Sequence, residues 1–75
     1  MTIHTYKIYG TYEIDGTRFN PYVVIEAADT DIAISYAKDE MESKLTTKVR
    51  ITEVWRGTKD KTGWELLRNL NLARG

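Results

Sequence analysis

The fold is decided by the stretch Tyr6-Lys7-Ile8-Tyr9-Gly10-Thr11-Tyr12-Glu13-Ile14-Asp15-Gly16, at residues 6–16. Apolar side chains fall mainly at every second position across residues 3–14, and a period of two predicts a β-strand. The Asp-Gly pair at its end predicts a tight hairpin turn, because these residues tolerate the left-handed backbone that such turns require. Gly10 lies on the apolar side of the strand, where a glycine indicates a bulge or a close approach by a helix.

A second strand, from about Arg18 to Ala27, is predicted after the turn. Two sets of side chains alternate along it, one for each face of the sheet: Phe19, Val23 and Ile25, and then Tyr22, Val24 and Glu26. Pro21 has no N–H to donate to a neighbouring strand, so this strand is predicted to lie at an edge of the sheet.

A helix is predicted to begin after Asp29 and to run to about Leu45. Asp29 is the expected N-cap, and Asp31 adds negative charge near the positive end of the helix. The apolar positions that recur at helical spacing predict the face that packs on the sheet. They are Ala33, Ile34, Ala37, Met41 and Leu45.

A third strand is predicted from Lys48 to Arg56. Its core face is assigned Val49, Ile51 and Trp55, and its open face Arg50, Thr52, Val54 and Arg56. Glu53 interrupts the apolar face, which indicates that the strand bulges or ends early at that point.

Residues 57–63 are predicted to form a polar loop, and the segment at residues 64–72 fits two kinds of structure. Thr62 and Glu65 have the spacing of a capping box, which favours a short helix. The tryptophan and leucines of the segment also fit a strand alternation that Arg68 interrupts. The short helix is the favoured prediction. The apolar segment either completes the core or docks on another chain.

These elements predict a single α+β domain over residues 1–75, with three strands, one main helix and a short C-terminal helix. A hairpin followed by a right-handed crossover gives a mainly antiparallel ββαβ sheet of order 2-1-3. The helix then covers one face of the sheet, and the opposite face is left open for recognition.

Composition limits the class of protein. A chain of 75 residues, with 41% hydrophobic and 29% charged residues, is typical of one small globular domain. The absence of cysteine excludes disulfides and thiolate chemistry. No apolar run reaches the roughly 18 residues of a membrane span, and the N-terminus lacks the pattern of a signal peptide. These features predict a soluble, cytoplasmic protein without a membrane partner.

The eleven basic and eleven acidic residues are unevenly distributed along the chain. Residues 1–42 hold three basic and eight acidic residues, a net charge of −5, and residues 43–75 hold eight and three, a net charge of +5. The two halves either neutralise each other within one compact fold or mark a surface for a partner or a second copy.

No set of residues has the pattern of an active site. His4 is the only histidine and has no serine or cysteine close to it in sequence, so no nucleophile and base are paired. The acidic residues around the helix are explained as capping groups and as a solvated face, and the glycines are too scattered for a phosphate-binding loop. The sequence therefore predicts no enzyme, no catalytic residue, no cofactor and no metal site.

Residues 9–54 resemble the ribosomal protein LX module of archaea, which has a strand–strand–helix–strand order. The matching stretches are Gly10-Thr11-Tyr12, Pro21-Tyr22, Ala28, Ser43-Lys44 and Lys48-Val49-Arg50-Ile51-Thr52-Glu53-Val54. The family usually has a Gly-Ser-Lys-His turn with further basic residues, where this chain has Glu42-Ser43-Lys44-Leu45 and a shorter loop. The C-terminal segment has no counterpart in the family. The resemblance implies this fold and an RNA-binding, ribosome-associated role.

The main prediction of function is a non-enzymatic binding module that docks on a larger protein or protein machine. A phage- or virus-type inhibitor that occupies the surface of a host factor, such as a defence nuclease, belongs to this class. The side chains expected to contact the protein partner are Ile32, Tyr36, Asp39, Glu40, Trp64, Leu67 and Leu70.

Two alternatives stand beside this prediction. Exposed aromatic side chains flanked by bases stack on nucleobases and hold phosphates, so the open sheet face offers an RNA site. Its expected residues are Lys7, Tyr9, Arg50 and Arg56. The other alternative is a homodimer, formed through the free edge of the third strand or through the C-terminal segment.

Overall fold

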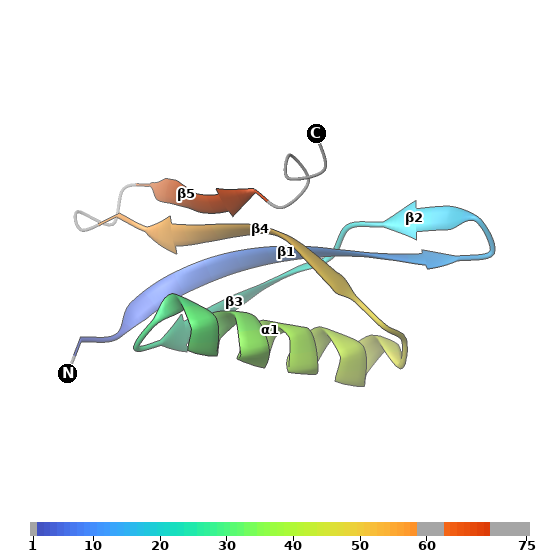
Figure 1. Cartoon of the computed structure of the whole chain (residues 1–75), viewed down its shortest axis with the longest axis horizontal. Helices are drawn as coiled ribbons and strands as arrows, with labels where there is room; N and C mark the ends of the chain where they lie inside the picture. The colour runs from blue at the N-terminus through green and yellow to red at the C-terminus, as the bar shows by residue number, and fades with distance from the viewer. Residues whose placement is uncertain (1, 59–62, 70–75) are drawn as a thin grey trace.

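The computed structural model describes residues 2–58 and 63–69. These residues form one helix and several strands, arranged as a curved sheet with α1 against one face (Figure 1). The elements are β1 (His4–Ile14), β2 (Thr17–Phe19), β3 (Tyr22–Ala27), α1 (Thr30–Leu45), β4 (Arg50–Gly57) and β5 (Trp64–Asn69). Within the described ranges, no helix combines the length and the apolar character needed to cross a membrane.

The longest strand, β1, lies in the middle of the sheet. It pairs with β2 and β3 along one side and with β4 along the other, and β5 pairs with the outer side of β4. All of these pairings are antiparallel. The α+β class and the central place of the first strand are therefore confirmed. The prediction of three strands in the order 2-1-3 is wrong in detail, because the described residues form a sheet of five strands.

One of the extra strands arises because Asn20 and Pro21 divide the predicted second strand into β2 and β3. Pro21 donates no hydrogen bond, but its carbonyl accepts the N–H of Gly10 at 2.9 Å. Among the described residues β3 pairs only with β1, so its predicted position at an edge is confirmed.

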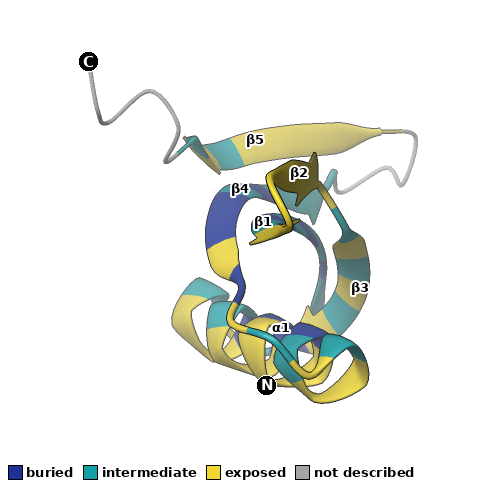
Figure 2. Ribbon diagram, turned by 90° about the vertical axis from the view of Figure 1, so that its right-hand side faces the viewer, coloured by how far each residue is buried: buried dark blue, intermediate teal, exposed yellow. Residues whose placement is uncertain are grey.

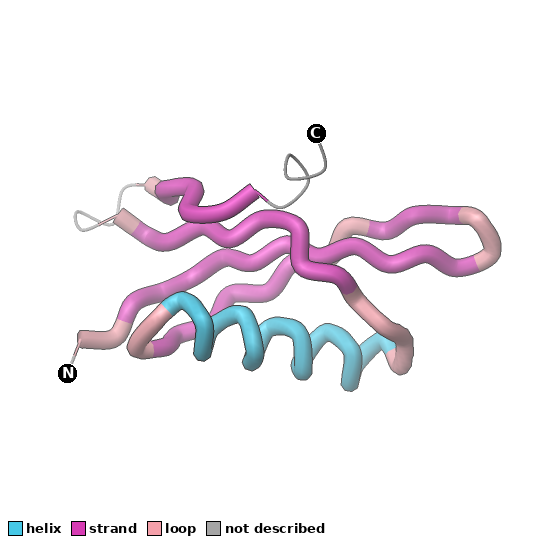
Figure 3. The backbone as a smooth tube through the Cα atoms, viewed as in Figure 1, coloured by secondary structure: helices cyan, strands magenta, loops and turns pink. Residues whose placement is uncertain are grey.

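The tight turn between β1 and β2 is also confirmed. Asp15 and Gly16 have φ angles of +52° and +81°, the left-handed backbone that a two-residue hairpin turn requires. Ile14 lies opposite Thr17 across this turn. The hairpin arm, residues 12–19, extends beyond the end of α1 (Figure 3).

The helix begins and packs as its sequence predicts. The Asp29 side chain accepts the backbone N–H of Ile32 at 2.9 Å, which makes Asp29 the N-cap. The buried residues of the helix are Ala33, Ala37 and Met41, and they contact the face of the sheet that carries Tyr6 and Ile8. Two alanines on this face let the helix backbone approach the sheet closely. Ile34 and Leu45 pack at the margin of the core.

Both features that the sequence indicates at Gly10, a bulge and a close approach by the helix, are present in the structure. The register between β1 and β4 shifts at Tyr9 and Gly10, which is a β-bulge. A Cβ atom built on Gly10 would lie only 2.6 Å from Cγ1 of Val49 and 3.2 Å from Cε of Met41. Gly10 is buried, and the helix and the start of β4 occupy the space that any larger residue would need.

The bulge changes which side chains of β4 face the helix. Tyr9 lies opposite Glu53 and Gly10 lies opposite Ile51, so Thr52 is the additional residue. One additional residue reverses the alternation that follows it. Val54 is consequently buried in the core and not on the open face, and Trp55 is on the open face and not in the core. The bulge indicated by Glu53 is confirmed, but the predicted faces of the residues after it are wrong.

The prediction of a short C-terminal helix is wrong, because residues 64–69 form the strand β5. This strand pairs with the edge of β4, with Leu66 opposite Trp55 and Trp64 opposite Gly57. The pairing supplies hydrogen-bond partners to the exposed edge of β4, which a separate helix would leave unpaired. Figure 2 shows β5 as a largely exposed strand at the rim of the sheet. Leu70 and Leu72 lie outside the described residues.

Candidate functional site

The sheet face that points away from α1 carries a group of aromatic and apolar side chains from four strands. Residues directly opposite each other in an antiparallel pair share one face, so the pairing register identifies the members. Lys7 lies opposite Val24 on β3 and opposite Trp55 on β4, and Trp55 lies opposite Leu66 on β5. We call this surface the aromatic face. It consists of Lys7, Tyr9, Tyr22, Val24, Trp55, Trp64 and Leu66.

Lys7 is the central residue of the aromatic face. Its Nζ atom lies 4.8 Å from the ring centroid of Tyr22, 5.5 Å from that of Tyr9 and 5.9 Å from that of Trp64. Such distances are typical of cation–π contacts, in which the negative face of a ring attracts the ammonium group. Across the described part of the chain, no carboxylate forms an ion pair with Lys7. The ammonium group of Lys7 therefore contacts aromatic rings and pairs with none of the described carboxylates.

The rings around Lys7 also contact one another and a neighbouring carboxylate. Tyr9 and Tyr22 lie directly opposite in the sheet, with ring centroids 5.5 Å apart and planes inclined at 39°. The indole N–H of Trp55 donates to Oε1 of Glu53 at 3.0 Å, which fixes the orientation of that ring. These contacts hold the aromatic side chains in place on rigid strands.

The aromatic face remains accessible to solvent. Four of its apolar members are more than two-fifths exposed: Tyr22 at 54%, Val24 at 53%, Leu66 at 42% and Trp64 at 41%. A contiguous patch of this kind on a small domain is typical of a surface that binds another molecule. Because α1 covers the opposite face of the sheet, no described helix shields these side chains.

The structure divides the residues predicted to bind a protein between two sides of the molecule. Ile32, Tyr36, Asp39 and Glu40 are exposed on α1, away from the aromatic face. Trp64 lies on the aromatic face, with its ring near Lys7. Leu67 packs partly buried against the core, and Leu70 lies outside the described residues. The predicted residues therefore do not form one surface.

The residues predicted to bind RNA are also divided. Lys7 and Tyr9 lie together on the aromatic face, and Arg50 lies at the hairpin end of β4, opposite Thr11. Arg56 lies opposite Tyr6, whose side chain faces the helix, because of the bulge at Thr52.

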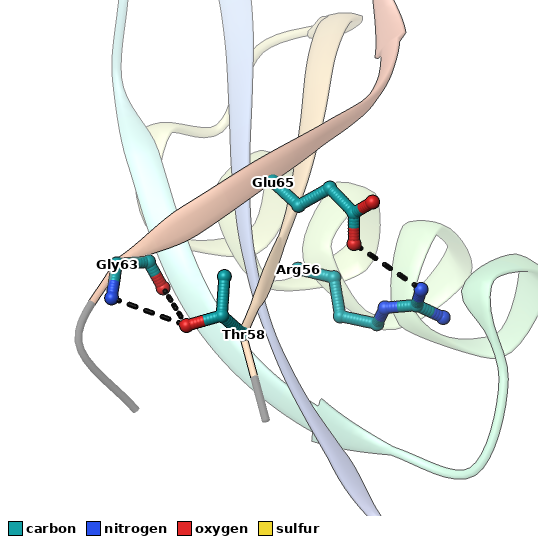
Figure 4. Close-up of polar contacts among 4 residues, drawn as sticks. All are labelled: Arg56, Thr58, Gly63 and Glu65. Carbon is teal, nitrogen blue, oxygen red and sulfur yellow. Dashed lines mark hydrogen bonds and ion pairs between the residues drawn. The ribbon is translucent and has the colours of Figure 1, made fainter. Parts of the chain in front are cut away.

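Arg56 is also engaged by a neighbour on β5. Its guanidinium forms an ion pair with Glu65 at 3.4 Å (Figure 4). Beside this pair, Thr58 Oγ1 accepts the backbone N–H of Gly63 at 3.2 Å. The backbone N–H of Thr58 donates in return to the Gly63 carbonyl at 3.0 Å. These contacts join the ends of β4 and β5. The ion pair with Glu65 engages the Arg56 guanidinium within the domain.

The groups of the aromatic face suit binding to a molecular surface. No group of three or more His, Asp or Glu side chains within them is placed to hold a metal ion. His4 contacts the ring of Tyr6 edge-on at 6.2 Å and has no hydroxyl partner on the strand beside it. Ring faces, methyl groups and one ammonium group can bind a molecular surface, and they pair no nucleophile with a base.

Four members of the aromatic face were not among the residues predicted to bind: Tyr22, Val24, Trp55 and Leu66. The sequence places Tyr22 and Val24 on one face of their strand but assigns them no binding role. Trp55 had been assigned to the core, and Leu66 belongs to the segment predicted as a helix. A signal for Trp55 was present in the sequence, because placing the bulge at Thr52 reverses the assignments of Val54 and Trp55 together. Leu66 could be assigned to this face only if residues 64–69 were recognised as a strand. That recognition depends on the edge of β4 and not on the local sequence.

Comparison with known proteins adds no assignment to this geometry. Scans against protein-family models, curated proteins and solved structures each gave no match to the chain. The resemblance of residues 9–54 to the ribosomal LX module therefore stays a prediction, and a proposal about function has to rest on the aromatic face and its surroundings.

Proposed function

We propose that this protein is a non-enzymatic binding module that docks on a larger protein through the aromatic face. The observation that carries the proposal is the exposed cluster of tyrosine and tryptophan rings around Lys7, which has no carboxylate partner among the described residues. Tyrosine and tryptophan are the side chains most enriched among the residues that dominate protein–protein affinity.

The arrangement of the face favours tight binding at low entropic cost. Its side chains stand on paired strands, and ring contacts and the Trp55–Glu53 hydrogen bond already restrict several of them. Groups that are ordered before binding lose less conformational entropy when a partner arrives. The loss of conformational entropy on binding therefore cancels less of the free energy gained by burying the rings than it would if the rings stood on a mobile loop.

The chemistry of the face also specifies its partner. The rings and the side chains of Val24 and Leu66 fit an apolar surface, and the ammonium of Lys7 lies among them. An ammonium that is buried in an interface without an opposite charge is destabilising. We therefore expect the partner to present an apolar patch with a carboxylate group opposite Lys7. Occupation of that patch would exclude its other ligands sterically.

A protein partner is favoured over RNA by the charges on this side of the sheet. Lys7 is the one basic residue of the aromatic face, and Glu26 and Glu53 lie on the same side of β3 and β4. Arg50 is also on this side, but it lies at the hairpin end, opposite Thr11. Arg56 is turned to the opposite face and paired with Glu65. Affinity for nucleic acid depends mainly on several basic groups that neutralise phosphates together, and this face does not present them.

A matched pair of tyrosine substitutions tests the proposal. Tyr22 is 54% exposed on the aromatic face and Tyr36 is 56% exposed on α1, so the two are matched in residue type and exposure. A partner is first identified by affinity capture with the native protein from a nuclease-treated extract, and its binding is then measured with purified components by calorimetry. We expect Tyr22→Ser to weaken the complex about tenfold, and Tyr36→Ser to change it less than about twofold.

The reverse pattern would contradict the proposal. If Tyr36→Ser weakens the complex and Tyr22→Ser does not, the binding surface is the exposed side of α1. If the captured complex disappears only when nuclease is added, the ligand is a nucleic acid and the protein-docking proposal is wrong. Both substitutions are at exposed positions, so circular dichroism should show the native fold in each variant.

A further inference from the structure

A second candidate site lies at the hairpin end of the sheet, away from the rings around Lys7. A depression of about 380 Å³ is lined there by side chains from β1, β2, the start of β4 and the segment just before β4. Its basic members are Arg18, Lys48 and Arg50, and its acidic member is Glu13. The lining therefore carries a formal charge of +2, although the whole chain is neutral.

Among the described residues, the basic groups of this depression have no carboxylate partner, as is also the case for Lys7. Lys44, Arg56 and Arg68 each form an ion pair at 3.5 Å or less. Within the described residues, Arg18, Lys48 and Arg50 form none, although Arg18 lies directly opposite Glu13 in the hairpin. Like charges brought together around one hollow raise its positive potential and attract an anion.

An unsatisfied hydroxyl lies in the same lining. Thr11 is opposite Arg50 on the neighbouring strand, and its Oγ1 atom is buried without a hydrogen-bond partner. It is the one described side-chain polar atom that is buried and unpaired in this way. Buried polar groups are nearly always hydrogen-bonded in folded proteins, and an exception calls for an explanation. A ligand oxygen in the depression would supply the missing partner once the adjoining side chains adjust.

We propose that this depression binds a phosphate group. The guanidinium groups of Arg18 and Arg50 present planar pairs of N–H donors that suit phosphate oxygens, and Lys48 adds a mobile positive charge. Thr11 donates its hydroxyl to a further oxygen. A phosphate group has enough acceptor oxygens for all of these donors, whereas a single carboxylate has two. The phosphate is either free or terminal, as in a monoester, or belongs to the backbone of a single-stranded nucleic acid.

A titration of the native protein with inorganic phosphate tests this site. Backbone amide signals are followed by NMR at constant ionic strength, with chloride replaced by phosphate. We expect saturable shifts centred on Thr11, Arg18 and Arg50. We expect Arg18→Gln and Lys48→Gln each to weaken phosphate binding about fivefold, which corresponds to the loss of one solvent-exposed charge contact.

Three further variants make the test specific. Glu13→Gln removes the one acidic group of the lining and should strengthen phosphate binding about fivefold. Thr11→Val removes the hydroxyl and should weaken binding without lowering the stability of the fold. Lys38→Gln changes an exposed lysine on α1 and should leave binding unchanged. Shifts that do not saturate, or that are equal in Arg18→Gln and Lys38→Gln, would overturn the proposal.

A second titration distinguishes the two sources of phosphate. A single-stranded oligoribonucleotide without terminal phosphates offers only backbone diesters. If it binds more tightly than inorganic phosphate and the binding depends on Arg18, the site takes a nucleic-acid backbone. If inorganic phosphate alone binds in an Arg18-dependent manner, the site takes a free or terminal phosphate. If neither ligand binds in that manner, the depression is not a phosphate site.

Discussion

Replacing Gly10 with alanine is expected to destabilise the fold by about 2–3 kcal/mol, the upper part of the range for overpacked cores. The new Cβ atom would lie 2.6 Å from Cγ1 of Val49, and 3.2 Å from both the Arg50 carbonyl oxygen and Cε of Met41. The methionine can move, but the valine is buried and the carbonyl belongs to the backbone of β4. Val49 and the backbone of β4 therefore have to move away from Gly10, which disturbs the packing at the bulge.

Urea denaturation followed by tryptophan fluorescence measures this effect. A small domain of this length has only a few kcal/mol of stability, so the Gly10→Ala variant should be partly unfolded without denaturant. Gly63→Ala is the matched control, because a Cβ atom on Gly63 meets nothing within 4 Å. The control should unfold at nearly the native midpoint. If both variants unfold at the native midpoint, the helix and β4 do not pack closely against Gly10.

Replacing Trp64 with alanine is expected to weaken partner binding about 30-fold or more while the domain stays folded, because central tryptophans contribute about 2 kcal/mol or more to an interface. The Trp64 side chain is 41% exposed and contacts the ammonium of Lys7 across the sheet face. Loss of that exposed cation–π contact costs the fold only about 0.5–1 kcal/mol. Binding should therefore suffer far more than stability.

Leu67→Ala provides the contrast for this prediction. Leu67 is partly buried and packs against the core, so its truncation should lower stability more than the Trp64 substitution does. Thermal unfolding and calorimetric titration of both variants separate the two effects. If Trp64→Ala unfolds the chain, the start of β5 belongs to the core and Trp64 is not a binding residue. If it stays folded and binds normally, the aromatic face loses its proposed anchor.

The elements that the sequence predicts well are those whose patterns depend on local geometry. The alternation of β1, the Asp15-Gly16 turn and the Asp29 cap each involve neighbours within a few residues, and each is present in the structure. Pro21 also indicates an edge position through its missing N–H alone. These signals were sufficient for the class of the fold and for the place of the helix.

The errors fall where a distant partner decides the local structure. The start of β5 has leucines at positions that satisfy both a helix and a strand, and the exposed edge of β4 selects the strand. Thr52 is the additional residue in β4 because the register with β1 shifts between Tyr9, opposite Glu53, and Gly10, opposite Ile51. Neither outcome is visible in a short window of sequence.

Only part of the candidate site could be predicted from the sequence, for the same reason. Lys7 and Tyr9 were correctly placed on the open face because β1 is regular up to Gly10. Trp55 was misplaced by the bulge, and the position of Trp64 beside Lys7 depends on two successive strand pairings. The residues of the proposed phosphate site come from two separate stretches of sequence, and the pairing of β1 with β2 and β4 brings them together.

Site-specific photo-crosslinking tests most directly whether the aromatic face is the surface that binds a partner. A photoreactive side chain is placed at Val24, which is 53% exposed on the aromatic face, and in a second protein at Ile32, which is 39% exposed on α1. We expect efficient crosslinking of the partner from position 24 and little from position 32. Crosslinking from position 32 with none from position 24 would contradict this expectation.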